Sequence, residues 1–535
     1  MAEKNLGLPP QAVEFAAVFC LTAVLAAWLG AFAYRDTLSE YDLYAAAIGL
    51  WDGQISGEGL RSRLHYYVWL SFGWIEFIAA LAPGDALGDA QSLMRFLNSV
   101  GFVSTLLVPA LTWWMLRLAH GGAIAVSATA MFVLSPIFLE IAGTGHPLLP
   151  GLVSFLVGGV LLFLPAYGWR RAVLWAAATA LLALALLLRF ELAFAFPFLV
   201  LARPRAETLR DFVANAAARA LPGVGAIAIF YATRFALLDP HAAGGANAFL
   251  DQWYDIANTP KGVVAAGLSA GVALSVAALW ATARVGGALW RDRAALTSSL
   301  QSHARFLAPL VLIATAAVFW LPNPLPARHF VLFVLGTAIL VALALDHARP
   351  NDVRRLMLTA LAIVVVNQAA AFATAPLAAR LSPSKLETPA GVLVPAPAEP
   401  AWTRRAALRE RSENTRRLAL RIANDSCANH LVVLSDQSPA LVTGFLQRGR
   451  RPSIEIGGAF PGAHAYFVRE NGRTIAFIQR NGAHSTDALP AVLSDPDYAG
   501  AAIFIDPMTR RRDDSNDIPP ERAETFACGV RGPTP

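Results

Sequence analysis

Long apolar segments recur along most of the 535-residue chain. A helix needs about 20 consecutive apolar residues to cross the hydrocarbon core of a bilayer. Only 15% of the residues are charged, against about 25% in an average soluble domain. The chain is therefore predicted to be an α-helical polytopic membrane protein with about eleven transmembrane helices. The apolar segments lie near residues 12–34, 92–118, 122–139, 148–167, 172–188, 190–202, 220–238, 261–283, 305–321, 328–345 and 354–376.

Composition excludes several other classes of protein. The three cysteines, Cys20, Cys427 and Cys528, are too few for a cysteine-based metal cluster or a disulfide scaffold. The sequence has no GxGxxG, no Walker lysine loop and no basic run interleaved with aromatics, so no nucleic-acid partner is expected. Cys427 and Cys528 bracket the C-terminal region. They are expected to pair if that region is extracytoplasmic, with two unpaired buried thiols as the alternative.

The segment from Tyr66 to Leu81 decides the membrane topology. It is apolar and aromatic but contains Glu76. If it does not cross, the Arg-rich loops, such as the one carrying Arg170 and Arg171, all fall on the cytoplasmic side, as the positive-inside rule requires. We therefore expect a juxtamembrane helix here, in the first outer loop. The first span is interpreted as an uncleaved signal anchor, with the N-terminus cytoplasmic and the C-terminus periplasmic in a bacterial inner membrane.

The composition changes beyond residue 380. Residues 381–400 are rich in proline and are predicted to be a linker. A small periplasmic α/β domain is predicted over 401–535, following a transmembrane catalytic domain over 1–380. Its expected helices cover 401–422 and 438–447. Its expected strands are Leu431–Leu434, Ala465–Val468, Thr474–Ile478 and Ala501–Ile505, with a turn signal at Asn471-Gly472.

Unusual polar residues gather on the predicted outer face. They are Glu40 and Asp42 in the stretch Ser39-Glu-Tyr-Asp-Leu-Tyr44, then Arg63, His65, His146, Arg189, Glu191, Arg328 and His329. Each has a simpler explanation. Glu40 and Asp42 would cap an interfacial helix, Arg189 and Glu191 would be an intramembrane pair joining helices, and Arg328 would reach toward lipid headgroups. Together, carboxylates and guanidinium groups beside a membrane groove suit transfer of a group from a lipid phosphate.

Five features, in this order, resemble the GT-C superfamily of membrane glycosyltransferases, in particular lipid A aminoarabinose transferases and protein O-mannosyltransferases. The resemblance covers about residues 10–205, with a weaker echo at Pro326-Ala-Arg-His-Phe330. Departures occur: the acidic motif here is Glu-Tyr-Asp where the family usually has Asp-Glu, and His146 stands near the place of an Asp. The features are Ser39–Tyr44, His65-Tyr-Tyr-Val-Trp-Leu70, Met94-Arg-Phe-Leu97, the outer loop from Ser135-Pro136 to His146-Pro147, and Leu188-Arg-Phe-Glu191.

The resemblance implies an inverting glycosyltransferase. The donor would be a sugar on a polyprenyl phosphate, and the acceptor a hydroxyl of an envelope glycan, lipid or protein. Asp42 would be the general base with Glu40 as its partner. Relatives that use monophosphate donors need no metal, whereas lipid-pyrophosphate users do, so a divalent metal stays open. The implied donor-phosphate residues are Arg63, Arg189, Arg328 and His329, and the implied acceptor or phosphate contacts are His65, Tyr66, His146 and Glu191.

Three other functions fit a chain of this composition. One is a transporter or flippase of lipid-linked glycans, which would need charged residues accessible from both sides of the membrane. Another is a polymerase of such glycans. The last is a receptor or scaffold anchored by its spans, which would not require so many of them.

Overall fold

The computed structural model describes two kinds of element, membrane-length helices and short strands. The chain divides into two compact units, one of Met1–Ala33 with Val100–Arg405 and the other of Tyr34–Ser99 with Ala406–Pro535. The described residues are 10–32, 55–56, 73–74, 77–78, 80–81, 90–202, 209–237, 256–291, 300–322, 327–348, 352–380, 387–388, 391–392, 430–433, 453–456, 464–470, 473–479 and 502–505.

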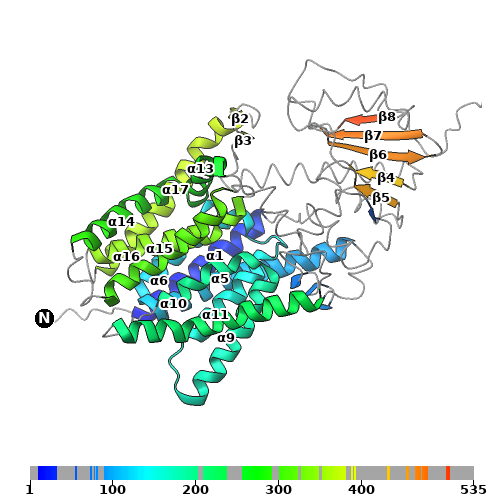
Figure 1. The fold of residues 1–535 in the computed structure, drawn as a ribbon. Coiled ribbons are helices and arrows are strands. Elements are labelled where there is room, and N and C mark those ends of the chain that lie inside the picture. The colour runs from blue at the N-terminus through cyan, green and yellow to red at the C-terminus, as the bar shows by residue number, and fades with distance from the viewer. Residues whose placement is uncertain are drawn as a thin grey trace, which may run out of the picture. The chain divides into compact units, whose positions relative to one another are not determined.

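Helices account for nearly all of the described part of the first unit, where they lie side by side in a bundle (Figure 1). Short 3₁₀-helices join several of them. The helices are α1 (Pro10–Phe32), α5 (Ala90–His120), α6 (Gly122–Val133), α7 (Pro136–Ile141), α8 (Leu148–Phe163), α9 (Gly168–Leu188), η1 (Phe190–Ala195), α10 (Phe196–Leu201), α11 (Leu209–Leu237), η3 (Ile256–Asn258), α13 (Thr259–Ala270), α14 (Val272–Arg291), α15 (Leu300–Trp320), η5 (Ala327–Phe330), α16 (Val331–Ala348) and α17 (Val353–Arg380).

The helices identify a multi-pass membrane protein. Among the described residues, six helices are long and apolar enough to span a bilayer, or seven if the bent pair α13 and α14 is one span. Four shorter apolar helices also coincide with predicted segments: Gly122–Val133, Leu148–Phe163, Phe190–Leu201 and Arg305–Trp320. The total of about eleven spans stays a prediction. Within the expected juxtamembrane segment, residues 73–74, 77–78 and 80–81 are helical.

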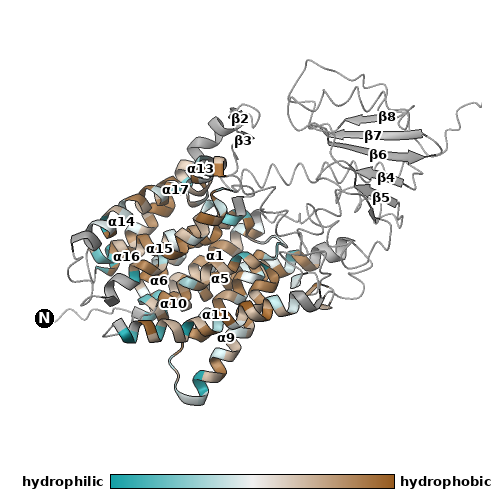
Figure 2. Ribbon diagram, in the orientation of Figure 1, coloured by the Kyte–Doolittle hydropathy of each residue, from teal (hydrophilic) through white to brown (hydrophobic). Residues whose placement is uncertain are grey.

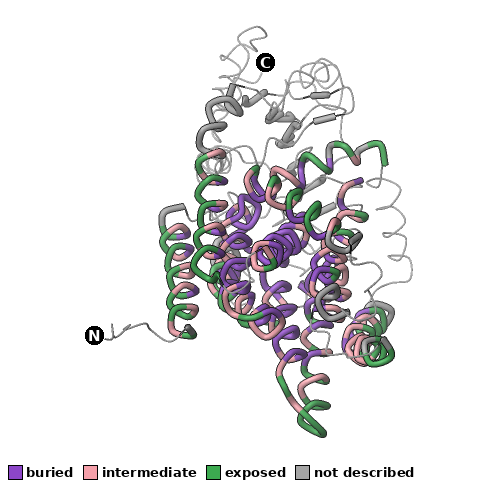
Figure 3. The backbone as a smooth tube through the Cα atoms, turned by 90° about the vertical axis from the view of Figure 1, so that its left-hand side faces the viewer, coloured by how far each residue is buried: buried purple, intermediate pink, exposed green. Residues whose placement is uncertain are grey.

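Helix α16 forms the centre of the bundle. From Val331 to Ala344 every residue except Phe333 is buried, because α6, α14 and α15 pack around it. A helix that is apolar on all sides is suited to the core of a large protein or to a membrane span. Figure 3 shows this buried centre inside more exposed helices, and Figure 2 shows that apolar residues also cover much of the outside. Exposed residues such as Phe15 and Phe19 on α1 suit contact with lipid tails.

A sharp break separates α13 from α14. The two helices meet at 106° across Gly271, whose φ of +88° favours glycine. The buried side chain of Asn367, on α17, satisfies the backbone groups that the break leaves without helical partners. Its Oδ1 accepts from the N–H of Ala273 at 2.7 Å and of Leu274 at 3.2 Å, and its Nδ2 donates to the carbonyl of Ala270 at 3.2 Å.

An Asn367→Leu variant is expected to be destabilised by about 2–5 kcal/mol. Leucine has a similar volume but leaves two N–H groups and a carbonyl unsatisfied in the interior. Thermal unfolding of the purified protein in detergent measures the loss. Val366→Leu, at an exposed neighbouring position, is the control. Equal unfolding temperatures for the two variants would show that Asn367 does not hold the break.

The second unit contains a six-stranded mixed sheet with the order β1-β5-β4-β6-β7-β8. Strand β5 pairs in parallel with β1 and β4, β6 is antiparallel to both β4 and β7, and β7 and β8 are parallel. A separate antiparallel pair, β2 and β3, lies within the predicted linker. The strands are β1 (Ile55–Ser56), β2 (Glu387–Thr388), β3 (Gly391–Val392), β4 (His430–Val433), β5 (Ser453–Ile456), β6 (His464–Glu470), β7 (Arg473–Gln479) and β8 (Ala502–Ile505).

Four of these eight strands coincide with the sequence prediction, and the other four, β1, β2, β3 and β5, were missed. The register Glu470↔Arg473 agrees with a hairpin turn at Asn471-Gly472. Strand β5 was missed because four residues give little periodic signal, and β1 because it is short and lies far in sequence from its partner β5. The helices predicted over 401–422 and 438–447, together with Cys427 and Cys528, lie outside the described residues, so the α/β domain stays a prediction.

Candidate functional site

A buried ion pair stands where α9 ends. The helix stops at Leu188 because Arg189 adopts an extended backbone, with φ −153° and ψ 105°. The 3₁₀-helix η1 follows at once and brings Glu191 back beside Arg189. Nη2 of Arg189 donates to Oε2 of Glu191 at 2.6 Å. Both side chains are almost fully buried, with 2% and 3% of their surfaces exposed.

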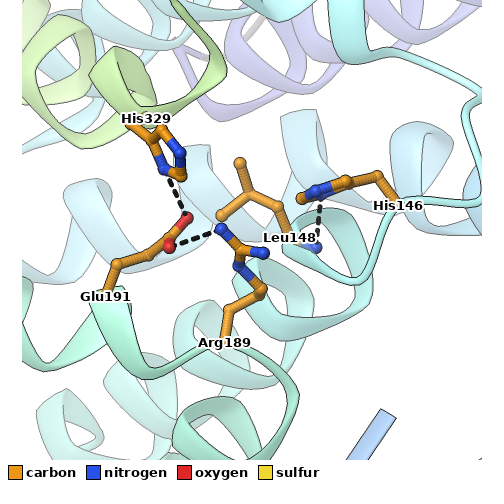
Figure 4. A network of polar contacts seen from close by, with 5 residues as sticks. All are labelled: His146, Leu148, Arg189, Glu191 and His329. Carbon is orange, nitrogen blue, oxygen red and sulfur yellow. Dashed lines mark hydrogen bonds and ion pairs between the residues drawn. The ribbon is translucent and has the colours of Figure 1, made fainter. Parts of the chain in front are cut away.

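A histidine from a distant part of the chain joins this pair. Nδ1 of His329, on η5, lies 3.5 Å from Oε1 of Glu191, so both carboxylate oxygens face a nitrogen (Figure 4). The imidazole ring is stacked on the indole of Trp320, with centroids 3.8 Å apart and the planes inclined by 11°. Trp320 ends α15. Stacking and the contact with Glu191 together fix the orientation of the ring.

Helix α15 also holds η1 in place. The hydroxyl of Thr315 donates to the backbone carbonyl of Phe194 at 2.8 Å. The rings of Phe194 and Phe319 are 4.5 Å apart between centroids. One helix therefore positions both 3₁₀-helices of the cluster. Sequence reasoning missed Thr315 and Trp320, although a tryptophan at the end of a span is typical of the membrane interface.

His146 lies at the start of α8. Its Nδ1 accepts from the backbone N–H of Leu148 at 3.2 Å, so the neutral imidazole carries its proton on Nε2. The side chain is buried. Helix α7 packs against η5 and α8 against η1, and Figure 4 shows His146 beside the cluster that these elements carry. His146 is therefore part of the buried interior rather than an exposed loop residue.

The loop before His146 is anchored on α5. The backbone N–H of Gly143, whose φ is +71°, donates to Oγ1 of Thr105 at 2.7 Å, and that hydroxyl donates to the carbonyl of Gly101 at 2.8 Å. A Cβ on Gly101 would collide with the carbonyl of Thr144. Only glycine at position 101 permits this close approach. In the sequence, only two features point to this contact between α5 and the loop: the single glycine in an apolar helix and the Gly-Thr-Gly stretch. Neither feature was enough to predict it.

Burial makes the cluster energetically demanding. A charge removed from water costs several kcal/mol, and attraction to a partner repays this only with good geometry and further hydrogen bonds. Ionisable groups within membrane bundles are rare and usually mark substrate or ion sites. The short hydrogen bond between Arg189 and Glu191 supplies part of this compensation. A guanidinium at this depth is suited to an anion such as a phosphate.

The structure brings together only part of the predicted site. Arg189, Glu191 and His329 are in contact, and His146 lies close by. The backbone of Arg328 is part of η5, but its side chain is outside the described residues. The remaining predicted site residues also lie outside the described residues. They are Glu40, Asp42, Arg63, His65 and Tyr66. The roles of all the predicted site residues, described or not, stay predictions.

The described part of the chain contains no group of three or more His, Cys, Asp or Glu side chains that could hold a metal ion. Two histidines and one glutamate lie at the cluster, but Glu191 already contacts Arg189 and His329. Nδ1 of His146 accepts a backbone hydrogen bond instead.

Fold and cluster together define a multi-pass α-helical membrane protein with a buried Arg–Glu–His cluster at the end of a span. The sequence matches no family model and no curated protein sequence. Among solved structures, one similar to it is ArnT from Cupriavidus metallidurans bound to undecaprenyl phosphate, with 12% sequence identity. That similarity covers 93% of this chain and 94% of the ArnT chain, with a TM-score of 0.44.

Proposed function

We propose that this protein is an inverting GT-C-like glycosyltransferase. The observation that carries the proposal is the buried Arg189–Glu191–His329 cluster, where a guanidinium is held at a fixed place within a membrane bundle. The ordered motifs that resemble the GT-C superfamily include Arg189 and Glu191, and the weaker echo includes His329. The donor would be a sugar linked to a polyprenyl phosphate, and the acceptor a hydroxyl of an envelope glycan, lipid or protein.

The reaction proposed is a single displacement. The acceptor hydroxyl attacks the anomeric carbon, the bond from that carbon to the phosphate oxygen breaks, and polyprenyl phosphate leaves with the bonding electrons. Asp42 takes the proton of the hydroxyl, and Glu40 orients the acceptor. Arg189 and His329 stabilise the charge that develops on the phosphate. Arg63 and Arg328 are further proposed phosphate contacts, and His65, Tyr66 and His146 are proposed contacts to acceptor or phosphate.

The proposed setting is the outer face of a bacterial inner membrane. The N-terminus would be cytoplasmic and the C-terminal domain periplasmic, because this orientation places the Arg-rich loops inside. The proposed division is a transmembrane catalytic domain over 1–380, a linker over 381–400 and a periplasmic domain over 401–535. A transporter or flippase of lipid-linked glycans is the alternative, since it too would hold a lipid phosphate.

Turnover of a defined donor distinguishes these functions. The purified protein is incubated with undecaprenyl-phosphate mannose or undecaprenyl-phosphate aminoarabinose and with an envelope extract as the source of acceptors. Release of free undecaprenyl phosphate is expected, and the Glu40→Gln/Asp42→Asn protein should release almost none. If the intact donor instead crosses the bilayer of reconstituted vesicles and no phosphate lipid is released, the chain is a transporter.

A further inference from the structure

A second basic and aromatic cluster lies at the opposite end of α9 from Arg189. Arg171 is 18 residues before Arg189, about 27 Å along the helix axis at 1.5 Å per residue. Around it, Tyr167 and Trp169 are 80% and 73% exposed. Tryptophan and tyrosine concentrate where a membrane meets water. This end of α9 therefore lies at headgroup level, in the leaflet opposite the Arg–Glu–His cluster.

A small polar pocket of about 110 Å³ opens at this end. Arg171 and Trp175 of α9 line one side of it, and Asn215 and Arg219 of α11 line the other. The Arg171 guanidinium lies over the Trp175 ring, 4.1 Å from its centroid, and this contact restrains the side chain. Among the residues that the structure describes, no carboxylate lines the pocket. Two guanidinium groups and an amide therefore lie in the lining of this pocket.

An apolar cavity of about 420 Å³ adjoins this pocket. Leu162 and Arg219 line both cavities, so the two cavities lie on either side of these side chains. Within the described part of the chain, Arg219 is the one charged residue that lines the larger cavity. The other described lining residues are apolar side chains or glycine from α8, α9, η1, α10 and α11. Val224, at its edge, is 60% exposed on the outer side of α11. The cavity is therefore within reach of lipid tails.

We propose that an anionic phospholipid of this leaflet binds here, with its phosphate on Arg171 and Arg219 and one tail in the apolar cavity. The fork of a guanidinium matches phosphate oxygens. The pocket lies at headgroup depth, where phospholipids present phosphates at high concentration. A free phosphate would have no use for the adjoining apolar cavity. By the positive-inside rule the leaflet is the cytoplasmic one.

The bound tail would contact the segment that carries the candidate site. Ala193 and Phe196 line the apolar cavity and follow Glu191 by two and five residues. A tail between α11 and this segment adds apolar contacts to η1 and α10. Since the lipid binds only the folded protein, its presence should raise the unfolding temperature. The lipid site does not depend on the proposed glycosyl transfer, and its readout is lipid binding rather than turnover.

Lipid binding to the full-length protein tests the site. Delipidated protein in detergent is titrated with phosphatidylglycerol, and bound lipid is counted by native mass spectrometry. The Arg171→Gln/Arg219→Gln variant is expected to bind about twenty-five-fold more weakly than the wild type, at about five-fold per guanidinium. Arg170→Gln is the matched control, because Arg170 is the neighbouring arginine and lies outside the pocket lining. This control should bind as the wild type does, and circular dichroism verifies the fold of each variant.

Three outcomes would overturn the assignment. The first is a double variant that binds phosphatidylglycerol as tightly as Arg170→Gln. In the second, diacylglycerol, which lacks the phosphate, binds as well as phosphatidylglycerol. In the third, undecaprenyl phosphate displaces phosphatidylglycerol at equal concentration, and this displacement requires both arginines. The occupant of the site would then be the polyprenyl lipid. A shift in unfolding temperature with phosphatidylglycerol, present in the wild type and absent in the double variant, supports the site independently.

Discussion

An Asp42→Asn variant is expected to bind the donor lipid as the wild type does and to lose about 10²–10⁴ in turnover, the usual cost of removing a general base. An acceptor hydroxyl has a pKa far above 7, so a group must take its proton as it attacks. Asparagine is nearly isosteric with aspartate but does not take a proton. Release of undecaprenyl phosphate at saturating donor measures the effect.

Glu40→Gln is the matched variant for this test. If Glu40 only orients the acceptor, its loss should be clearly smaller than that of Asp42→Asn. An inactive Glu40→Gln with an active Asp42→Asn would exchange the two roles. Near-normal turnover in both variants would show that the acidic stretch only caps an interfacial helix. Donor binding, measured separately, shows whether each variant keeps its fold.

Arg189→Ala is expected to cost about 3–5 kcal/mol of stability and to abolish detectable donor binding. Removing one partner of a buried ion pair leaves the other charge uncompensated, and Glu191 is almost fully buried. Nδ1 of His329 lies 3.5 Å from Oε1 of Glu191, and this contact would compensate only part of the cost of the unpaired carboxylate. Thermal unfolding and donor-lipid binding measure the two losses separately.

Arg189→Leu/Glu191→Leu separates a phosphate site from a structural pair. Replacing a buried pair with apolar residues of similar volume is often neutral or stabilising by about 1–4 kcal/mol. The double variant should therefore unfold near the wild-type temperature and still fail to bind donor. If it binds donor as the wild type does, Arg189 and Glu191 only join helices, and the phosphate-binding role is wrong. Thr315→Val is a useful control, because it weakens the attachment of η1 without removing a charge.

Much of the fold followed from the sequence because the bilayer imposes a length and a polarity on each span. The predicted apolar segments are helical, since apolar runs of this kind need no tertiary information. The breaks that divide the segments 122–139, 190–202 and 261–283 into two elements each were not predicted. Strands β6 and β7 were also predictable, because an Asn-Gly turn between alternating residues is a local signal. Strand β1 was not, because its partner β5 lies some 400 residues later in the chain.

The candidate site divides in the same way. The sequence by itself singled out Arg189, Glu191, His146 and His329, because charged and polar side chains beside apolar runs are unusual and costly. Tertiary structure alone decided that His329 meets Glu191, that Trp320 stacks on the imidazole, and that the cavity beside Arg219 opens at the other end of α9. The physical reason is the distance along the chain over which each property is determined. Burial and helix length are properties of a short stretch of chain. By contrast, the contact of His329 with Glu191 joins residues more than a hundred positions apart. The stacking of Trp320 on His329 depends on how α15 meets η5, and the cavity depends on how α8, α9, α10 and α11 pack.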